Sequence, residues 1–548
     1  MLYVMPFLLA MVVTMACLPA FGRVATKWRI VDKPGARKVH GVAIPRIGGL
    51  AMMMGVLVAA AIVIPLGQSD RYFLLAGVVL TAFGVLDDRF DLDYRLKFAG
   101  QLMAVLLVVF GADIQIHSIT LVDQVTLPPW VAVPLTVFFL VGITNAINLA
   151  DGLDGLAGGT TFLCLGALAM LAHSGGQLTA AAMALAFAGA VLGFLRFNTY
   201  PASVFMGDAG SQLLGFAVGV LSLRATQSGD SVVSAATPIL LFALPILDTL
   251  SVMVQRISEG RSPFSADKNH IHHKLLKLGF DHHEAVMVIY LIQADLLLMA
   301  YWLRYESDLE ILAVVTIFFV AAITLLQIAT RRGWQFRQAS GARKDSPLTR
   351  LISTLREPRH LPRWSYIAVA VSVGSYACLI LTETASLSSD VYILVLALLA
   401  VSVVLLAILR VKPLNLVEKA ALYVTMTVLV YLDSVVLPEH RIVSALIWAA
   451  ISVAAAGTVL RLRLSRDRRF VLTPLDLIVL FVALVVPSLP GSFALPDGGA
   501  GGIAKLVILF YALEVVLSRV DVDVGVVWIR VAVTGFLLGL TLRPLMPL

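Results

Sequence analysis

The chain has 548 residues, of which 59% are apolar and only 14% are charged, and its mean hydropathy is +0.92. Soluble proteins carry about 25% charged residues, so this composition excludes a soluble globular protein, a disordered chain and a fibrous one. It predicts an all-α, polytopic integral membrane protein. The three cysteines lie in apolar stretches and give neither a disulfide framework nor metal-ligand spacing. The net charge of +7 indicates basic loops beside a membrane rather than nucleic-acid binding.

The N-terminal apolar run, at residues 2–22, has its positive charges after it rather than before it. Arg23, Lys27 and Arg29 are the first of them. A secretory signal carries its charge ahead of the apolar run. We therefore expect a first membrane span with its N-terminus outside, and a cleaved signal is the less favoured alternative.

Apolar runs of helical length fill most of the chain, and the first 330 residues hold about eleven. They lie near 2–22, 47–67, 71–86, 98–112, 131–148, 159–173, 177–195, 210–223, 233–254, 284–303 and 309–329. Seven more lie near 364–382, 390–409, 420–437, 442–460, 471–489, 503–518 and 526–542. We predict three parts, which are a helical domain at 1–330, a basic linker or interfacial helix at 331–363, and a second transmembrane domain at 364–548.

The distribution of Lys and Arg fixes the expected topology. Up to residue 363, the loops that follow odd-numbered helices hold 25 of these residues, and the opposite loops hold 3. Loops rich in Lys and Arg stay in the cytoplasm. The odd-numbered helices are therefore expected to end on the cytoplasmic side.

Acidic and histidine residues gather in a few polar segments, all of them on this predicted cytoplasmic side. The segments are 33–49, Asp87–Asp91, Asn145–Gly155, Phe205–Ser211 and His270–His273. Neighbouring carboxylates repel each other unless a cation lies between them, and oxygen-rich sites suit Mg²⁺ that also bridges phosphates. Together the segments predict an active site at the cytoplasmic membrane surface.

Simpler alternatives remain open for single segments. Asp87 and Asp88 could be a solvated helix end, and Asp208 with Ser211 could cap a helix. The three histidines could bind zinc, although the segment offers no cysteine to complete such a site. A glycine-rich segment with Asp151 and Asp154 directly after an apolar span is harder to explain structurally, because carboxylates at membrane depth are costly.

Taken together, the segments closely resemble the polyprenyl-phosphate N-acetylhexosamine-1-phosphate transferase superfamily, in its bacterial undecaprenyl-phosphate GlcNAc-1-phosphate branch within glycosyltransferase family 4. The resemblance covers about residues 1–330. It is carried by Asp32-x-Pro34-x-x-Arg37-Lys38-x-His40, Ile44-Pro45-Arg46-x-Gly48-Gly49, Asp87-Asp88 with Lys97-Phe98, Asn145-x-x-Asn148-x-x-Asp151-Gly-x-Asp154-Gly, Phe205-Met-Gly-Asp208-x-Gly-Ser211 and His270-x-His272-His273. The histidine and Ile-Pro-Arg forms favour this branch over the phospho-MurNAc-pentapeptide translocases, which stay as the alternative.

The resemblance implies a role for each matching residue. Asp208 would bind Mg²⁺ (or Mn²⁺) directly, Asn148 and Asp151 would hold the metal–diphosphate region, and one of Asp87 and Asp88 would orient or deprotonate the lipid phosphate. The remaining residues would bind substrate: Lys97, Lys38 and Arg46 at phosphate, Asp154 and Phe205 at uracil, and His270, His272 and His273 at the diphosphate and sugar.

The implied reaction is transfer of N-acetylhexosamine-1-phosphate, with GlcNAc favoured, from its UDP-sugar to undecaprenyl phosphate in the bacterial inner membrane. This reaction would initiate a cell-envelope polysaccharide such as lipopolysaccharide. A membrane transporter is the rival class, with Asp248 and Asp295 as its evidence. The role of 364–548 stays open between a scaffold, an accessory to lipid-linked sugar handling and an unrelated transporter, and a homodimer is one option for the assembly.

Overall fold

The computed structural model describes most of the first 335 residues and separate parts of the remainder. The described residues are 3–32, 43–120, 124–228, 233–262, 269–335, 361–383, some residues between 392 and 403, 416–435, 441–464, 499–517 and 525–542. The chain divides into two compact units, of which the first contains Met1–Gly341 and the second most of the rest. The predicted run at 471–489, most of the predicted linker or interfacial helix at 331–363, and Lys38 lie outside the described residues.

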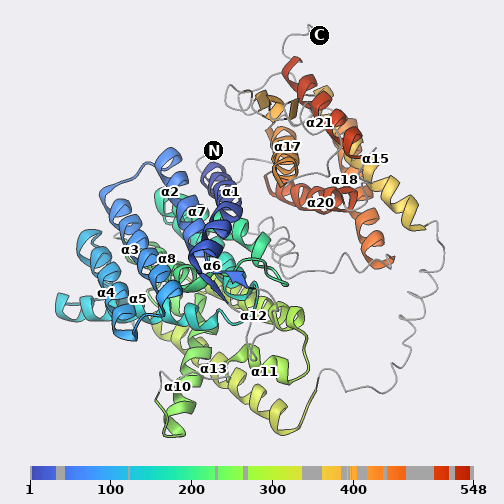
Figure 1. The fold of residues 1–548 in the computed structure, drawn as a ribbon. Coiled ribbons are helices and arrows are strands. Elements are labelled where there is room, and N and C mark those ends of the chain that lie inside the picture. Colours follow the sequence, from blue (N-terminus) through green and yellow to red (C-terminus); the bar gives the residue numbers. More distant parts are fainter. Residues whose placement is uncertain are drawn as a thin grey trace. The chain divides into compact units, whose positions relative to one another are not determined.

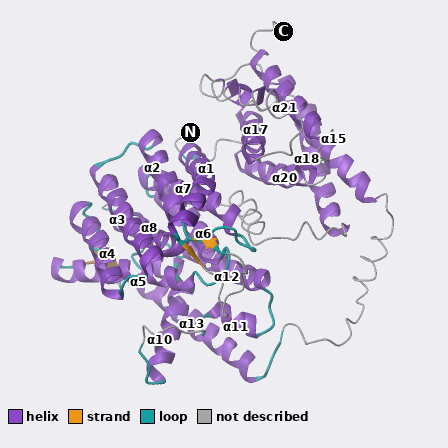
Figure 2. Ribbon diagram, viewed as in Figure 1, coloured by secondary structure: helices purple, strands orange, loops and turns teal. Residues whose placement is uncertain are grey.

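The all-α prediction is confirmed, because helices form both units and the strands are very short (Figure 2). The first unit contains α1 (Val4–Trp28), α2 (Gly48–Val63), α3 (Gln68–Phe90), α4 (Tyr94–Leu106) continued by the π-helical turn η1 (Leu107–Gly111), α5 (Pro129–Ala150), α6 (Leu156–Ser174), α7 (Leu178–Asn198), α8 (Gly207–Gln227), α9 (Thr237–Leu241), α10 (Ala243–Ser258), α11 (Ile271–Lys277), α12 (His282–Trp302) and α13 (Asp308–Arg331). Two antiparallel strand pairs join β1 (Val31–Asp32) to β2 (Ile44–Pro45) and β3 (Ser118–Thr120) to β4 (Gln124–Thr126). Among the described residues, eight helices are long and apolar enough to cross a membrane.

The predicted run at 233–254 is wrong as one helix, because α9 ends at Leu241 and α10 begins at Ala243. Pro245 lies in the first turn of α10. A proline ring collides with the carbonyl of the residue four positions earlier, here Leu241, and this collision favours a break at this point. The break separates α9 from α10, which carries Asp248.

Helix α8 is the buried centre of the first unit, and it packs against α2, α3, α5, α6 and α7 (Figure 1). Its side chains are buried on nearly every side. Small residues allow this crowding, since Gly49 of α2 and Gly84 of α3 lie directly against the backbone of Ala209 and Gly210. The first turn of α8 is therefore held by two neighbouring helices.

Gly84→Ala tests this close packing. A β-carbon at residue 84 would overlap the backbone of Ala209 and push α3 away from α8. We expect the free energy of unfolding to fall by about 1–3 kcal/mol, as at other overpacked sites, and the melting temperature to fall with it. Gly142→Ala in α5 is the matched control, because open space surrounds that position. Equal melting temperatures for the two variants in detergent would contradict the packing described here.

The second unit contains α15 (Leu361–Glu383), α17 (Leu416–Val435), α18 (Arg441–Leu464), α20 (Gly499–Leu517) and α21 (Gly525–Leu542). Among its apolar side chains lies a buried ion pair, in which Lys505 Nζ is 2.6 Å from Asp433 Oδ2. Tyr376 donates its hydroxyl to the same oxygen at 3.0 Å, and the Lys505 ammonium lies 4.8 Å from the centre of the Trp448 ring. The pair ties α17 to α20 across an apolar interior.

Lys505→Met is expected to destabilise this unit by about 3–5 kcal/mol, because Asp433 would stay buried without its cation. Adding Asp433→Asn to Lys505→Met should restore much of the loss, since the uncompensated charge is then gone. Thermal unfolding of the full-length variants measures both effects. A Lys505→Met protein as stable as the wild type, or a double variant less stable than the single one, would contradict the buried pair.

Candidate active site

The carboxylate of Asp88 joins the end of α3 to the start of α8. Its Oδ1 accepts the backbone N–H of Asp208 at 3.0 Å, and its Oδ2 accepts that of Ala209 at 3.2 Å. Gly207 permits this approach, because it has a φ of +72° and a β-carbon there would overlap the carboxylate. Asp88, from another helix, thus caps α8, and the simple reading of Asp208 and Ser211 as the cap is wrong. The Asp208 side chain remains available for other partners.

Lys97 lies between two of the predicted carboxylates. Its Nζ is 2.7 Å from Asp87 Oδ2 and 3.5 Å from Asp208 Oδ2. Asp93 places it by capping α4, since the Asp93 side chain accepts the N–H of Arg95 at 2.8 Å. Asp87 is buried, and its other oxygen accepts the N–H of Leu92 at 2.9 Å.

Asn148, near the end of α5, contacts the same centre from the other side. Its Nδ2 donates to Asp208 Oδ1 at 3.1 Å and to Ser211 Oγ at 2.7 Å. Asp151 is the residue directly after α5 and forms its C-terminal cap. Asp154, three residues later in the same loop, accepts the N–H of Ala202 at 2.9 Å, which ties this loop to the segment before α8.

These carboxylates change one another's ionisation. Burial, together with the charge of Asp208, raises the pKa of Asp87 to about 6 and those of Asp88 and Asp151 to about 7. Burial alone would raise the pKa of Asp208 as well, but hydrogen bonds from Asp87 and Asn148 and the charge of Lys97 lower it. Asp208 is therefore the member of this cluster that stays most firmly ionised.

The first loop reaches this cluster through Arg46. Its guanidinium pairs with Asp32 and lies 3.9 Å from Asp88 Oδ1. The backbone beside it pairs with the segment before α8, since the N–H of Phe205 donates to Pro45 at 2.8 Å and the N–H of Gly48 donates to Phe205 at 3.1 Å. These bonds position the half-buried Phe205 next to the charged centre.

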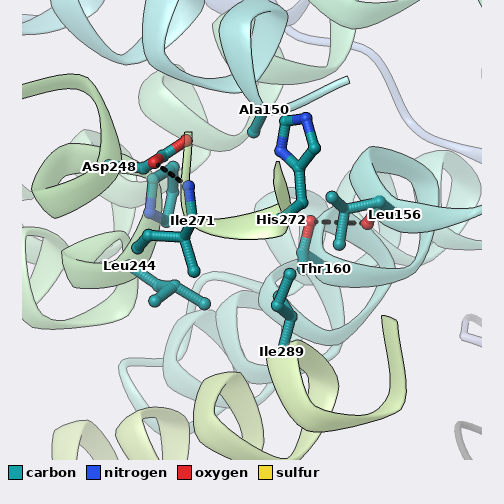
Figure 3. A pocket seen from close by; sticks show the side chains of 9 residues that line it. Ala150, Leu156, Thr160, Leu244, Asp248, Ile271, His272 and Ile289 are labelled. Atoms are coloured by element: carbon teal, nitrogen blue, oxygen red, sulfur yellow. Dashed lines mark hydrogen bonds between the residues drawn. The ribbon is translucent and has the colours of Figure 1, made fainter. Parts of the chain in front are cut away.

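The histidine segment lies against the Asn145–Gly155 loop. The ring of His272 is buried and lies so close to Gly152 that a β-carbon there would overlap it. Burial and the neighbouring His273 lower the pKa of His272 to about 4, so this ring is neutral at pH 7. His272 also lines a mainly apolar pocket with Ala150, Leu156, Thr160, Leu244, Pro245, Asp248, Ile271 and Ile289 (Figure 3).

The structure thus brings most of the predicted site residues together at one end of the helices. Direct contacts join Arg46, Asp87, Asp88, Lys97, Asn148 and Asp208. Asp151 and Asp154 lie in the adjoining loop, Phe205 is held by its backbone, and His272 lies over Gly152. In the part of the chain that the structure describes, no three His, Cys, Asp or Glu side chains form a ready metal-binding group.

Three supporting side chains were not among the predicted site residues. Asn198 accepts the N–H of Gly155 at 2.9 Å, and Tyr290 donates its buried hydroxyl to the Gly155 carbonyl at 2.5 Å. Asp248 contacts His270, with 2.9 Å between Asp248 Oδ2 and His270 Nδ1. The sequence signal for Asp248 is a carboxylate within an apolar run, which alone is also the evidence for the rival transporter class.

Comparison with known proteins gives a consistent result. The family described as glycosyl transferase family 4 matches residues 71–226. A Bacillus subtilis (strain 168) protein named "Probable undecaprenyl-phosphate N-acetylglucosaminyl 1-phosphate transferase" is 38% identical over 53% of this chain and 81% of its own length. The undecaprenyl-phosphate alpha-N-acetylglucosaminyl 1-phosphate transferase of Escherichia coli (strain K12) is 33% identical over 57% of this chain and 87% of its own. The decaprenyl-phosphate N-acetylglucosaminephosphotransferase of Mycobacterium tuberculosis (strain ATCC 25618 / H37Rv) is 37% identical over 49% of this chain and 74% of its own length.

Asp151→Asn tests the electrostatics of the site. Since the pKa of Asp151 rises from 3.8 to about 7 on folding, its ionisation destabilises the fold as the pH rises between these values. In the presence of a chelator, the variant should melt about 2 °C higher than the wild type above pH 7 and equally at pH 4. The exposed Asp91→Asn is the control and should show no such pH dependence. A lower melting temperature for Asp151→Asn above pH 7 would contradict the repulsion.

Proposed function

Because this chain belongs to glycosyl transferase family 4, in its polyprenyl-phosphate N-acetylhexosamine-1-phosphate transferase branch, we propose that it transfers N-acetylglucosamine-1-phosphate from UDP-GlcNAc to undecaprenyl phosphate. The products are undecaprenyl-diphosphate-GlcNAc and UMP. The observation that carries this proposal is the convergence of Asp87, Asp88, Lys97, Asn148 and Asp208 at one end of an apolar helix bundle. The relatives' names supply the sugar and the class of lipid.

The proposed step is a direct displacement at phosphorus. An oxygen of the lipid phosphate attacks the β-phosphorus of UDP-GlcNAc, a new P–O bond forms, and the bond from that phosphorus to the UMP oxygen breaks. Such reactions need mainly positioning and neutralisation of charge. Lys97 and Arg46 would supply this positive charge. Their cationic groups are held at the site by Asp87 and Asp88 respectively.

The two neighbouring carboxylates have different roles in this proposal. Asp88 uses both oxygens to accept backbone N–H groups of α8, so it holds the site together. Asp87 accepts only one backbone N–H, that of Leu92, and its other oxygen faces the Lys97 ammonium. Its raised pKa of about 6 is close to that of a phosphate monoester. We therefore assign to Asp87 the task of orienting the lipid phosphate and accepting its proton.

The donor chemistry of the cluster suits a hard divalent cation. Asp208 and Asp151 offer carboxylate oxygens and Asn148 an amide oxygen, and mutual repulsion among the carboxylates favours a cation among them. These residues would hold Mg²⁺, with Mn²⁺ as the alternative. When bound, the cation would neutralise charge on the diphosphate. Three protein ligands leave positions for water and substrate oxygens.

The remaining contacts concern the nucleotide and the sugar. We propose that Asp154 and Phe205 bind the uracil, because the bond from Ala202 to Asp154 ties the α5–α6 loop, which carries Asp154, to the α7–α8 loop, which carries Phe205. His272 and His273 belong to α11, whose His272 ring lies against Gly152 of the α5–α6 loop, and they would contact the diphosphate and sugar. The lipid phosphate would approach at the membrane surface, and we place the site on the cytoplasmic face of the bacterial inner membrane because basic loops lie there.

Release of UMP tests the proposal. Purified full-length protein receives undecaprenyl phosphate, Mg²⁺ and, separately, UDP-GlcNAc, UDP-GalNAc or UDP-MurNAc-pentapeptide. We expect UMP with UDP-GlcNAc, dependent on both lipid and cation. Asp208→Asn should lower kcat by at least about 100-fold, because it removes the most firmly ionised carboxylate.

Exposed carboxylates provide the control for this assay. Asp295→Asn changes an exposed residue of α12 and should leave UMP release unchanged. Release only with the pentapeptide nucleotide would move the chain to the other branch of the family. No release with any donor from folded protein would overturn the proposed reaction.

A further inference from the structure

Asp248 is a buried carboxylate that the reaction outlined above does not use. It lies on α10 and is 6% exposed, and His270, 22 positions later in the chain, is 7% exposed. Asp248 Oδ2 is 2.9 Å from His270 Nδ1, and Asp248 Oδ1 accepts the N–H of Ile271 at 2.6 Å. Figure 3 shows the second of these bonds at the edge of the apolar pocket. One carboxylate thus holds both the side chain and the backbone at the start of the histidine segment.

We propose that Asp248 is a positioning residue, and that His270 is its anchor rather than a substrate ligand. A carboxylate only accepts hydrogen bonds, so His270 must carry its proton on Nδ1. Ile271 begins α11, and no side chain of the segment itself caps that helix. Asp248 therefore sets where α11 begins.

The position of α11 decides where the next two histidines lie. The rings of His270 and His272 are parallel, with centres 5.7 Å apart, and the rings of His272 and His273 are 4.3 Å apart. His272 in turn lies over Gly152, between Asp151 and Asp154. The contact from Asp248 thus reaches the loop that carries the proposed nucleotide and metal residues, without Asp248 touching that loop's carboxylates.

The same geometry explains why a carboxylate occurs in this apolar stretch. Both oxygens of Asp248 have hydrogen-bond partners in the histidine segment, so these bonds offset the free-energy cost of burying the carboxylate. An ion path would need a carboxylate that is free to exchange partners, and Asp248 is fixed by two. The contact therefore also removes one of the two residues that supported a transporter.

Substitutions that change one hydrogen bond at a time test the anchor. Asp248→Asn keeps an acceptor for Ile271 but presents an N–H₂ group to His270, which forces the proton from Nδ1 to Nε2. His270→Gln removes the nitrogen at the δ position. His270→Asn is the matched control, because its amide N–H₂ stands where Nδ1 stands and can still donate to Asp248.

The readout rests on the proposed reaction and uses full-length protein in the UMP-release assay. Asp248→Asn and His270→Gln should each lower kcat/KM for UDP-GlcNAc by about 10–100-fold, as loss of a partner that orients a functional histidine does. The KM for undecaprenyl phosphate should not change, and His270→Asn should stay near wild type. The double variant Asp248→Asn/His270→Gln should be no worse than the poorer single variant, because one contact is lost in all three.

Several results would overturn the inference. A large loss in His270→Asn would make His270 a substrate ligand. Equal reduction of kcat with unchanged KM for both substrates would indicate only a smaller folded fraction, and additive losses in the double variant would mean that the two residues act separately.

If the wild type itself releases no UMP, the proposed function fails and the anchor is judged by thermal unfolding of the same variants. Non-additive losses of stability for Asp248→Asn and His270→Gln would then support the contact. Additive losses would overturn it.

Discussion

The site depends on one interaction, which is the acceptance by Asp88 of the first backbone N–H groups of α8. It joins the end of α3 to the start of the most deeply buried helix, and glycines at 84 and 207 leave the room that it needs. With the cap supplied from α3, the Asp208 side chain turns instead toward Lys97 and Asn148. The charged centre thus draws its side chains from four helices, α3, α4, α5 and α8, which direct contacts join to one another.

The accumulation of carboxylates on this framework explains both its chemistry and its cost. Burial and mutual repulsion raise the pKa of Asp87, Asp88 and Asp151, whereas Asp208 stays ionised beside Lys97. Such a set is unfavourable for the fold alone. It is suited to a cation and a diphosphate, which together supply the charges that this arrangement lacks.

Much of this could be predicted from the sequence. Apolar runs predict the helices, and the location of Asp87, Asn148 and Asp208 on the same predicted side of the membrane indicates that they converge. Contacts between distant residues could not be predicted. Neither the pairing of Asp248 with His270 nor that of Asp433 with Lys505 leaves a periodic pattern. The break before α10 and the capping of α8 by a neighbouring helix depend on packing, which local propensity does not encode.

The most direct measurement of the central claim counts the Mn²⁺ ions bound per chain, from the paramagnetic signal of free Mn²⁺, with and without UDP-GlcNAc. We expect one bound Mn²⁺ per wild-type chain, with a higher affinity when UDP-GlcNAc is present. This binding should be lost in Asp208→Asn and kept in Asp91→Asn. Wild-type protein that binds no Mn²⁺ under either condition, or an Asp208→Asn variant that binds it equally well, would contradict a cation site built on these carboxylates.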